Sequence, residues 1–247
     1  MAEYRHLTNA PITEAVIDLQ ARLSTNFQVS SFLPLKQELY NHYPGFRQRR
    51  FISGGFGFER DRPIIKTAEN SGVDGYIFTS EDNKCAVQFR KDGFTFSRLK
   101  PYTNWENVYS EAMRLWGIYL DKAKPTAVTR VAVRFINLLQ IPLPINDFTD
   151  YLTTPPGIPR ETPQIVRSFF SKVVINDNEK GLDANIIQAL EKGIGTDNAN
   201  IILDIDAYKV KDFNINENFN LTFSQLRDLK NRIFFSSITE KTARLYV

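Results

Sequence analysis

Two carboxylates stand one residue apart at the end of an apolar run, because Asp204 and Asp206 follow Ile201, Ile202 and Leu203. In an extended strand, side chains two positions apart point to the same face, and neighbouring carboxylates can hold Mg²⁺ or Mn²⁺ beside a phosphate group. The glycine-rich acidic hairpin that would complete such a site is missing from the sequence that follows. A polar edge on a sheet strand is therefore the simpler interpretation, and a metal site is the alternative.

Charged residues also alternate with apolar ones in two separate segments, residues 14–23 and 127–141. This period of two predicts strands with one apolar and one polar face. If the two strands pair, their acidic and basic side chains could meet and line a groove. The alternative is a solvated sheet face with cross-strand ion pairs worth a few tenths to about 1 kcal/mol each. The candidates for the groove are Glu14, Asp18, Arg130, Arg134 and Asn137.

Basic residues are concentrated in residues 46–66, where arginines are interleaved with Phe46 and Phe51. Guanidinium groups between aromatic rings can bind phosphates and stack on bases, as proteins that hold single-stranded nucleic acid do. Glu59 and Asp61 reduce the local charge, so a solvated loop is the competing interpretation. The candidate basic surface consists of Arg47, Arg49, Arg50, Arg60 and Arg62.

The supply of cysteine and histidine limits the remaining chemistry. Cys85, His6 and His42 are the whole supply, whereas a Cys/His zinc site needs about four ligands and a disulfide needs two cysteines. No serine or cysteine nucleophile motif accompanies the histidines. The glycines at 54–57 and 193–195 complete no phosphate-binding loop. Any catalysis would therefore depend on carboxylates, on Arg or Lys, or on a metal held by oxygen.

The composition is typical of a globular chain: 247 residues, 42% hydrophobic and 24% charged, with a net charge of +3. That excess is too small to mark a dedicated nucleic-acid-binding protein. No apolar stretch is long enough for a membrane helix, and the first residues do not have the pattern of a secretory signal. We expect a cytoplasmic protein with a reduced Cys85, without membrane association and without a resident cofactor.

The first half of the sequence contains the elements that would position these residues. A strand at 14–23 is followed by a short helix that ends at Tyr43-Pro44-Gly45. Thr103 and Glu106 form a capping box, which predicts the start of a long helix with Trp105 and Trp116 on its apolar face. Extended runs between the two helices are expected at 51–58, 75–80, 86–90 and 94–99.

The second half repeats this order of elements without repeating the sequence. A strand at 127–141 precedes a short helical piece at 148–152, and Thr222 and Gln225 form a second capping box that predicts a final long helix. Extended runs are expected between them at 165–175, 184–189 and 199–208.

This order predicts an α+β protein made of two tandem β-α-β(3–4)-α halves. The halves would be residues 1–125 and 126–247, packed together as one globular unit. Each half would have its own antiparallel sheet, packed by its long C-terminal helix. The expected fold is a pseudo-duplicated, helix-grip or TBP-like arrangement.

Three motifs carry a resemblance to a known family: N-A-P-I-T-E-A-V at 9–16, R-L-K-P-Y-T-N-W at 98–105 and R-V-A-V-R-F-I-N at 130–137. Together they resemble a sporadically distributed bacterial family of uncharacterised proteins, over nearly the whole chain. The resemblance implies no activity. It implies an accessory gene, in a genome-defence, mobile-element or toxin-antitoxin context.

Two classes of function follow from the sequence. The favoured one is a non-enzymatic binding protein of an accessory bacterial system, whose ligand is a partner protein or, as a second choice, nucleic acid. The alternative is a metal-dependent phosphodiesterase or nucleotide-processing enzyme that uses Mg²⁺ or Mn²⁺. Its carboxylates would be Glu14, Asp18, Asp204 and Asp206.

Overall fold

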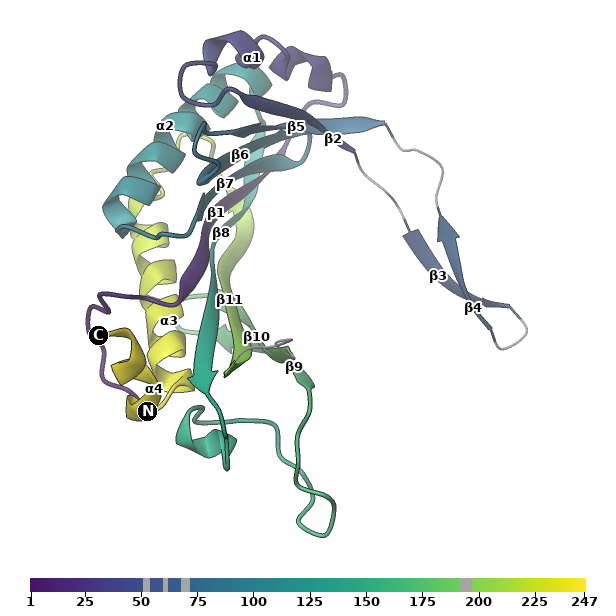
Figure 1. The fold of residues 1–247 in the computed structure, drawn as a ribbon. Helices are drawn as coiled ribbons and strands as arrows, with labels where there is room; N and C mark the ends of the chain where they lie inside the picture. The colour runs from purple at the N-terminus through teal and green to yellow at the C-terminus, as the bar shows by residue number, and fades with distance from the viewer. Residues whose placement is uncertain (51–53, 60–61, 68–71, 192–196) are drawn as a thin grey trace.

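The computed structural model of the chain describes residues 1–50, 54–59, 62–67, 72–191 and 197–247. Its centre is one nine-stranded antiparallel sheet with the strand order β2-β5-β6-β7-β1-β8-β11-β10-β9 (Figure 1). The strands of this sheet are β1 (Ile12–Arg22), β2 (Gly45–Arg50), β5 (Val73–Thr79), β6 (Cys85–Arg90), β7 (Gly93–Leu99), β8 (Ala127–Pro142), β9 (Phe169–Asp177), β10 (Leu182–Glu191) and β11 (Asn198–Phe213). Strands β3 (Gly54–Glu59) and β4 (Arg62–Thr67) form a separate two-stranded sheet.

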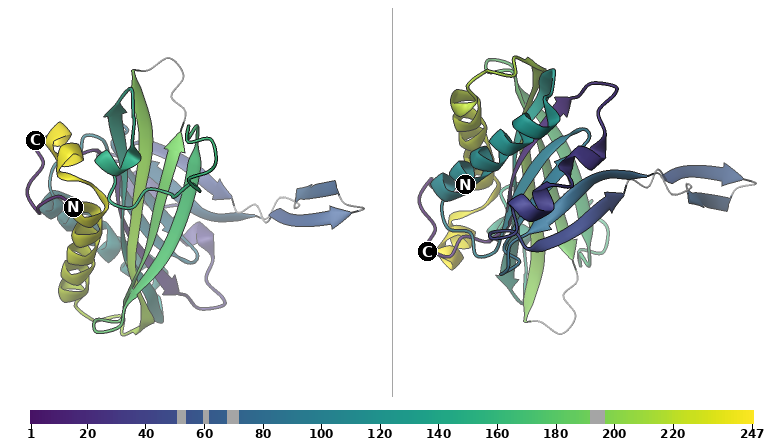
Figure 2. Two further views of the ribbon diagram at one scale, coloured as in Figure 1. Left: turned by 90° about the horizontal axis from the view of Figure 1, so that it is seen from below. Right: turned by 90° about the horizontal axis from the view of Figure 1, so that it is seen from above.

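The two long helices, α2 (Trp105–Ala123) and α3 (Asn220–Ser237), lie on the same face of the nine-stranded sheet (Figures 1 and 2). None of the described helices lies on the opposite face, and the sheet curves so that this face is concave (Figure 1). We call it the concave face. Two helices of one turn, α1 (Leu35–Glu38) and α4 (Glu240–Ala243), and short 3₁₀ segments complete the described elements. None of the described helices is long and apolar enough to cross a membrane.

Alternation along the central strands explains why one face is covered and the other is polar. In β1, Ala15, Ile17 and Leu19 are fully buried on the helix side. The residues between them face the other way. On α2, an apolar stripe meets the sheet, where Trp116 packs edge-on against Phe94 with ring centroids 5.7 Å apart. The hydrophobic core therefore lies between the sheet and its two long helices.

The prediction of two separate sheets is wrong. β1 and β8, which were expected to open two packed halves with a sheet each, pair with each other along their length, for example Ile17 with Val133. All nine strands thus belong to one sheet. Periodicity indicates which face of each strand is apolar, but it does not specify which distant strand will be the neighbour. β1 and β8 each have one buried apolar face and one polar face. By pairing with each other, they satisfy the hydrogen bonds of their backbone N–H and C=O groups.

Several local predictions need correction. Asn104, not Thr103, caps α2, and its side chain accepts a hydrogen bond from the backbone N–H of Asn107. Thr222 lies inside α3, which begins at Asn220 without a side-chain cap. The segment at 46–50, for which a loop was the competing interpretation, belongs to edge strand β2. The strands predicted at 75–80, 86–90 and 94–99 are confirmed by β5, β6 and β7.

Gly93 allows β7 to approach β1 closely. It lies opposite Gln20 with φ of +151°, and a Cβ there would lie 2.3 Å from the carbonyl oxygen of Leu19. We expect Gly93→Ala to lower the free energy of unfolding by about 2 kcal/mol, measured by urea denaturation. Gly117→Ala is the control, because Gly117 is exposed on α2 and a Cβ there meets nothing within 4 Å. This change should raise stability by about 0.5 to 1 kcal/mol, and equal effects of the two changes would contradict the close approach.

Candidate functional site

A chain of ion pairs crosses the middle of the concave face. Asp18 of β1 accepts hydrogen bonds from Arg90 of β6 at 3.0 Å and from Arg130 of β8 at 3.2 Å. Arg130 also donates to Asp206 of β11 at 2.8 Å, and its guanidinium lies 4.5 Å from the ring centre of Tyr208. The side chains of the three ion-paired residues Asp18, Arg130 and Asp206 are only 15–20% exposed. Four strands are therefore joined by one partly buried charged network, which we call the charge ladder.

Arg134 and Asp204 form a second pair beside the ladder. Arg134 Nε donates to Asp204 Oδ1 at 2.9 Å, and Nη2 donates to Oδ2 at 2.5 Å. The hydrogen bonds to this carboxylate raise the pKa of Arg134 further above its ordinary value. Such a two-pronged contact fixes both side chains. The side chain of Asp204 is 8% exposed and that of Arg134 is 46% exposed, so the carboxylate is buried while the guanidinium reaches solvent.

The metal hypothesis finds its carboxylates already bound to arginines. Asp204 and Asp206 share the concave face, as their spacing predicted, but each accepts two hydrogen bonds from a guanidinium group. Asp18 likewise lies between Arg90 and Arg130. Within the described residues, no cluster of three or more His, Cys, Asp or Glu side chains could hold a metal ion. The carboxylates of Asp18, Asp204 and Asp206 are therefore suited to ion pairs within the molecule.

The candidate basic surface is divided by the fold. Arg47, Arg49 and Arg50 lie on edge strand β2, where Arg49 pairs with Asp74 of β5 at 2.5 Å. Arg60 lies outside the described residues. Arg62 begins β4, a strand of which only the backbone is described. Arg47 and Arg50 are exposed.

The opposite edge strand, β9, exposes apolar side chains on both of its faces. The exposed fractions are 69% for Phe170, 51% for Val173, 56% for Val174 and 36% for Ile175. Phe170 and Val174 point to one side of the sheet, and Val173 and Ile175 point to the other. In the part of the chain that the structure describes, β10 is the only strand paired with β9. We call this strand and its exposed side chains the β9 edge.

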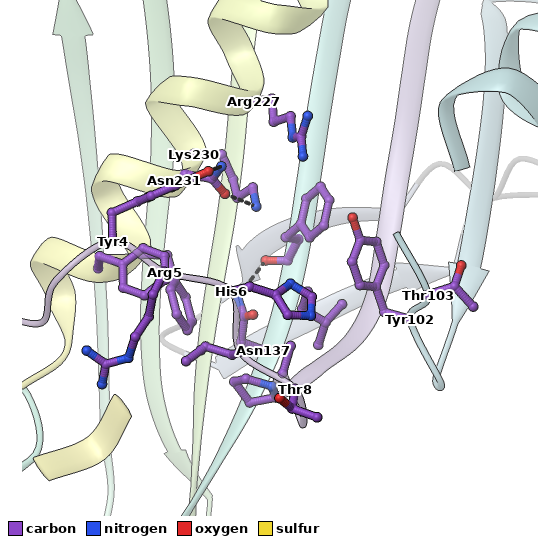
Figure 3. A pocket seen from close by; sticks show the side chains of 17 residues that line it. Tyr4, Arg5, His6, Thr8, Tyr102, Thr103, Asn137, Arg227, Lys230 and Asn231 are labelled. Carbon is purple, nitrogen blue, oxygen red and sulfur yellow. Dashed lines mark hydrogen bonds between the residues drawn. The ribbon is translucent and has the colours of Figure 1, made fainter. Parts of the chain in front are cut away.

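A cavity of about 330 Å³ lies on the helix side of the sheet (Figure 3). The segment that precedes β1, the loop that precedes α2, helix α3 and strand β8 enclose it. Lys230 of α3 is 8% exposed and lies over the ring of Phe135, with Nζ 3.9 Å from the ring centre. The lysine donates one hydrogen bond, to Asn231 Oδ1 at 2.5 Å.

Burial of Lys230 changes its protonation. Removal from water disfavours the charged form of the amine, and the nearby positive charge of Arg227 adds to this effect, so the pKa of Lys230 is lowered to about 7. Within the described residues, no carboxylate forms an ion pair with it. Burial also raises the pKa of Tyr102, across the cavity, to about 12, so this phenol stays neutral. The cavity therefore holds a buried amine that is half protonated near neutral pH.

Asn137 lies on the helix side, away from the other groove candidates. Its amide nitrogen donates to the carbonyl oxygens of Leu203 at 2.9 Å and of Phe135 at 3.3 Å, and it lines the cavity. Neither the cavity nor Lys230 was predicted from the sequence. A signal for the lysine exists, because Phe223, Leu226, Lys230 and Phe234 follow one another at helical spacing on the buried side of α3.

The chain was compared with known proteins by sequence and by structure. No protein-family model, no curated protein and no solved structure matches it. The site must therefore be interpreted from its own geometry.

Proposed function

We propose that the chain is a non-enzymatic binding protein, and that it binds an extended segment of a partner protein along the β9 edge. The observation that carries this proposal is the exposure of four apolar side chains on a nine-residue edge strand. An edge strand offers unpaired backbone N–H and C=O groups, and another chain can add a strand to them. The partner's strand would extend the sheet beyond β9.

The composition of β9 supports an interface rather than a protected edge. Natural edge strands usually carry charges, proline or bulges that prevent pairing. β9 contains no proline, and Lys172 is the only basic residue in it. Its pairing with β10 is regular from Phe169 to Asp177, without a bulge. A long, regular, apolar edge is costly to leave in water, and a partner strand would cover it.

The charges of the sheet favour a protein partner over nucleic acid. Nucleic-acid affinity comes largely from cations that are free to neutralise phosphates. Of the eight arginines in the described strands of this sheet, five already pair with carboxylates of the same molecule, and Arg47, Arg50 and Arg98 do not pair with a described carboxylate. The arginines with a carboxylate oxygen within 3.5 Å are Arg22, Arg49, Arg90, Arg130 and Arg134.

The motif resemblance suggests where such a partner would be found. A sporadically inherited accessory system usually brings its interacting proteins in neighbouring genes, so a cognate toxin or effector is the partner that fits this proposal. No observation in the described structure favours the metal-dependent alternative.

A matched pair of valines tests the proposal. Val174 lies on the β9 edge and is 56% exposed, whereas Val210 lies on interior strand β11 and is 62% exposed. Tagged wild-type protein and both valine-to-lysine variants are purified from the natural host, and bound proteins are quantified by mass spectrometry. We expect Val174→Lys to lose a specific protein partner by about tenfold or more, and Val210→Lys to retain it.

Three outcomes would overturn the proposal. One is equal recovery of the partner by both variants, and another is a ligand released by nuclease treatment. The third is a stable self-dimer of the purified chain in light scattering that Val174→Lys converts to monomer, because the β9 edge would then be occupied by a second copy.

A further inference from the structure

The cavity beneath α3 contains positive charge that no acidic residue within it balances. Its lining includes Arg5, Arg227 and Lys230 but no aspartate or glutamate. Arg5 is neutralised outside the cavity by Glu240, with two hydrogen bonds of 2.7 and 3.0 Å. Arg227 is 3.5 Å from Glu106, a side chain that is 70% exposed. Lys230 alone is buried without a carboxylate partner in the described part of the chain.

Lys230 retains donors for a ligand. An ammonium group has three N–H donors, and the structure uses one of them, toward Asn231. The ring of Phe135 lies 3.9 Å from Nζ and stabilises positive charge by its π face. Arg227 lies one helical turn before Lys230 on the same helix, and its side chain is 40% exposed. The two cations therefore lie at different depths along one wall of the cavity (Figure 3).

The rest of the lining is mixed, and polar and apolar groups contribute to it in similar measure. Rings and aliphatic side chains lie beside the hydroxyl groups of Thr8 and Thr103 and the amide of Asn137. The volume of about 330 Å³ is near the lower end of the range for small-molecule sites, about 300–1,000 Å³. The apolar lining residues include Leu7, Pro11, Ile12, Tyr102, Phe135 and Phe234.

We propose that this cavity binds a small organic carboxylate with a partly apolar body, and that its carboxylate pairs with Nζ of Lys230 while Arg227 closes the outer side. A carboxylate fits better than a phosphate ester. Arg5 and Arg227 already have carboxylate partners in Glu240 and Glu106. The buried ammonium of Lys230 therefore balances one negative charge, and a second charge buried beside it without a partner is disfavoured. This site is on the face opposite the concave face and does not depend on the β9 edge.

Benzoate and benzamide are the probes, because they have the same shape and differ in charge. Binding to the full chain is measured by isothermal titration calorimetry, with cyclohexanecarboxylate and phenyl phosphate as further arms. We expect wild type to bind benzoate and cyclohexanecarboxylate, and to bind benzamide and phenyl phosphate at least about tenfold more weakly. Lys230→Met should weaken benzoate binding about tenfold or more and leave benzamide unchanged.

Proton uptake gives a second, independent readout. Pairing with a carboxylate favours the charged amine, so benzoate binding at about pH 8 should draw close to one proton from the buffer in wild type and none in Lys230→Met. Heats measured in buffers of different ionisation enthalpy give this number. The other titratable or charged groups of the cavity are Tyr4, Arg5 and His6 before β1, Tyr102 before α2, and Arg227 on α3.

His6→Gln removes the imidazole of the lining and is the control for the proton count, and Arg227→Met provides a second binding variant should Lys230→Met fail to fold. The proposal is overturned if neither carboxylate binds wild type. It is also overturned if Lys230→Met, or Arg227→Met in its place, binds benzoate as well as wild type does, or if benzamide binds as tightly as benzoate. Preference for phenyl phosphate over both carboxylates would assign the cavity to phosphate esters instead.

Discussion

Lys230→Met is expected to raise the free energy of unfolding at pH 7 by about 3 kcal/mol. The amine is 8% exposed, and burial lowers its pKa to about 7, whereas an unfolded chain has a lysine pKa of about 10.4. Between these values the unfolded state binds one proton more than the folded state, so lysine opposes folding. Methionine has a similar length and carries no charge into the apolar site.

The pH dependence of stability distinguishes the removal of a buried, titrating amine from a simple improvement in packing by methionine. Because the folded-state pKa is depressed, the stability of wild type should increase as the pH rises from about 7 toward 9, by about 2 to 3 kcal/mol from this group. Lys230→Met lacks that slope, so the difference between the two proteins should be largest near pH 7 and should narrow at higher pH. Urea denaturation at a series of pH values measures it, and a constant difference would contradict a buried, deprotonating lysine.

Arg130→Met is expected to lower the free energy of unfolding by about 3 kcal/mol. The change removes the central cation of the charge ladder, and among the described residues it leaves Asp206 with Asn185, at 3.2 Å, as a hydrogen-bond donor. Asp18 keeps Arg90 and Thr95, so the loss falls mainly on Asp206. A partly buried carboxylate without its partner is the source of the destabilisation.

Arg22→Met is the matched control for the ladder. Arg22 pairs with Asp212 at 3.0 Å, but their side chains are 57% and 67% exposed, so removal of this pair should change stability by less than about 0.5 kcal/mol. Adding Asp206→Asn to Arg130→Met should restore part of the loss, because the uncompensated charge is removed. Similar losses of stability for Arg22→Met and Arg130→Met would contradict the claim that the partly buried charge ladder stabilises the fold more than an exposed ion pair does.

Much of the local structure could be predicted from the sequence, because local periodicity encodes it. The alternation around Asp18 and Arg130 placed both side chains on polar strand faces, and the apolar stripe of Trp105 and Trp116 identified α2. The pairing of β1 with β8 could not be read in this way. Those strands are more than 100 residues apart, and period-two alternation is the same for any neighbour.

The candidate sites also include one feature that the sequence predicted and one that it did not. The meeting of Asp18 with Arg130 was foreseen as one alternative, since oppositely charged faces favour adjacent strands. The β9 edge was not foreseen, because Val173, Val174 and Ile175 read simply as an apolar strand. Their exposure depends on the absence of a described neighbour beyond β9, which is a property of the whole sheet.

Site-specific photo-crosslinking in the natural host tests the central claim most directly. A photoreactive amino acid is placed at position 174 on the β9 edge, or at position 210 on β11 as the matched control. We predict that irradiation links position 174, and not position 210, to one defined partner protein, in an adduct that resists nuclease. A nuclease-sensitive adduct, a partner crosslinked only from position 210, or no adduct at position 174 would contradict a protein-binding β9 edge.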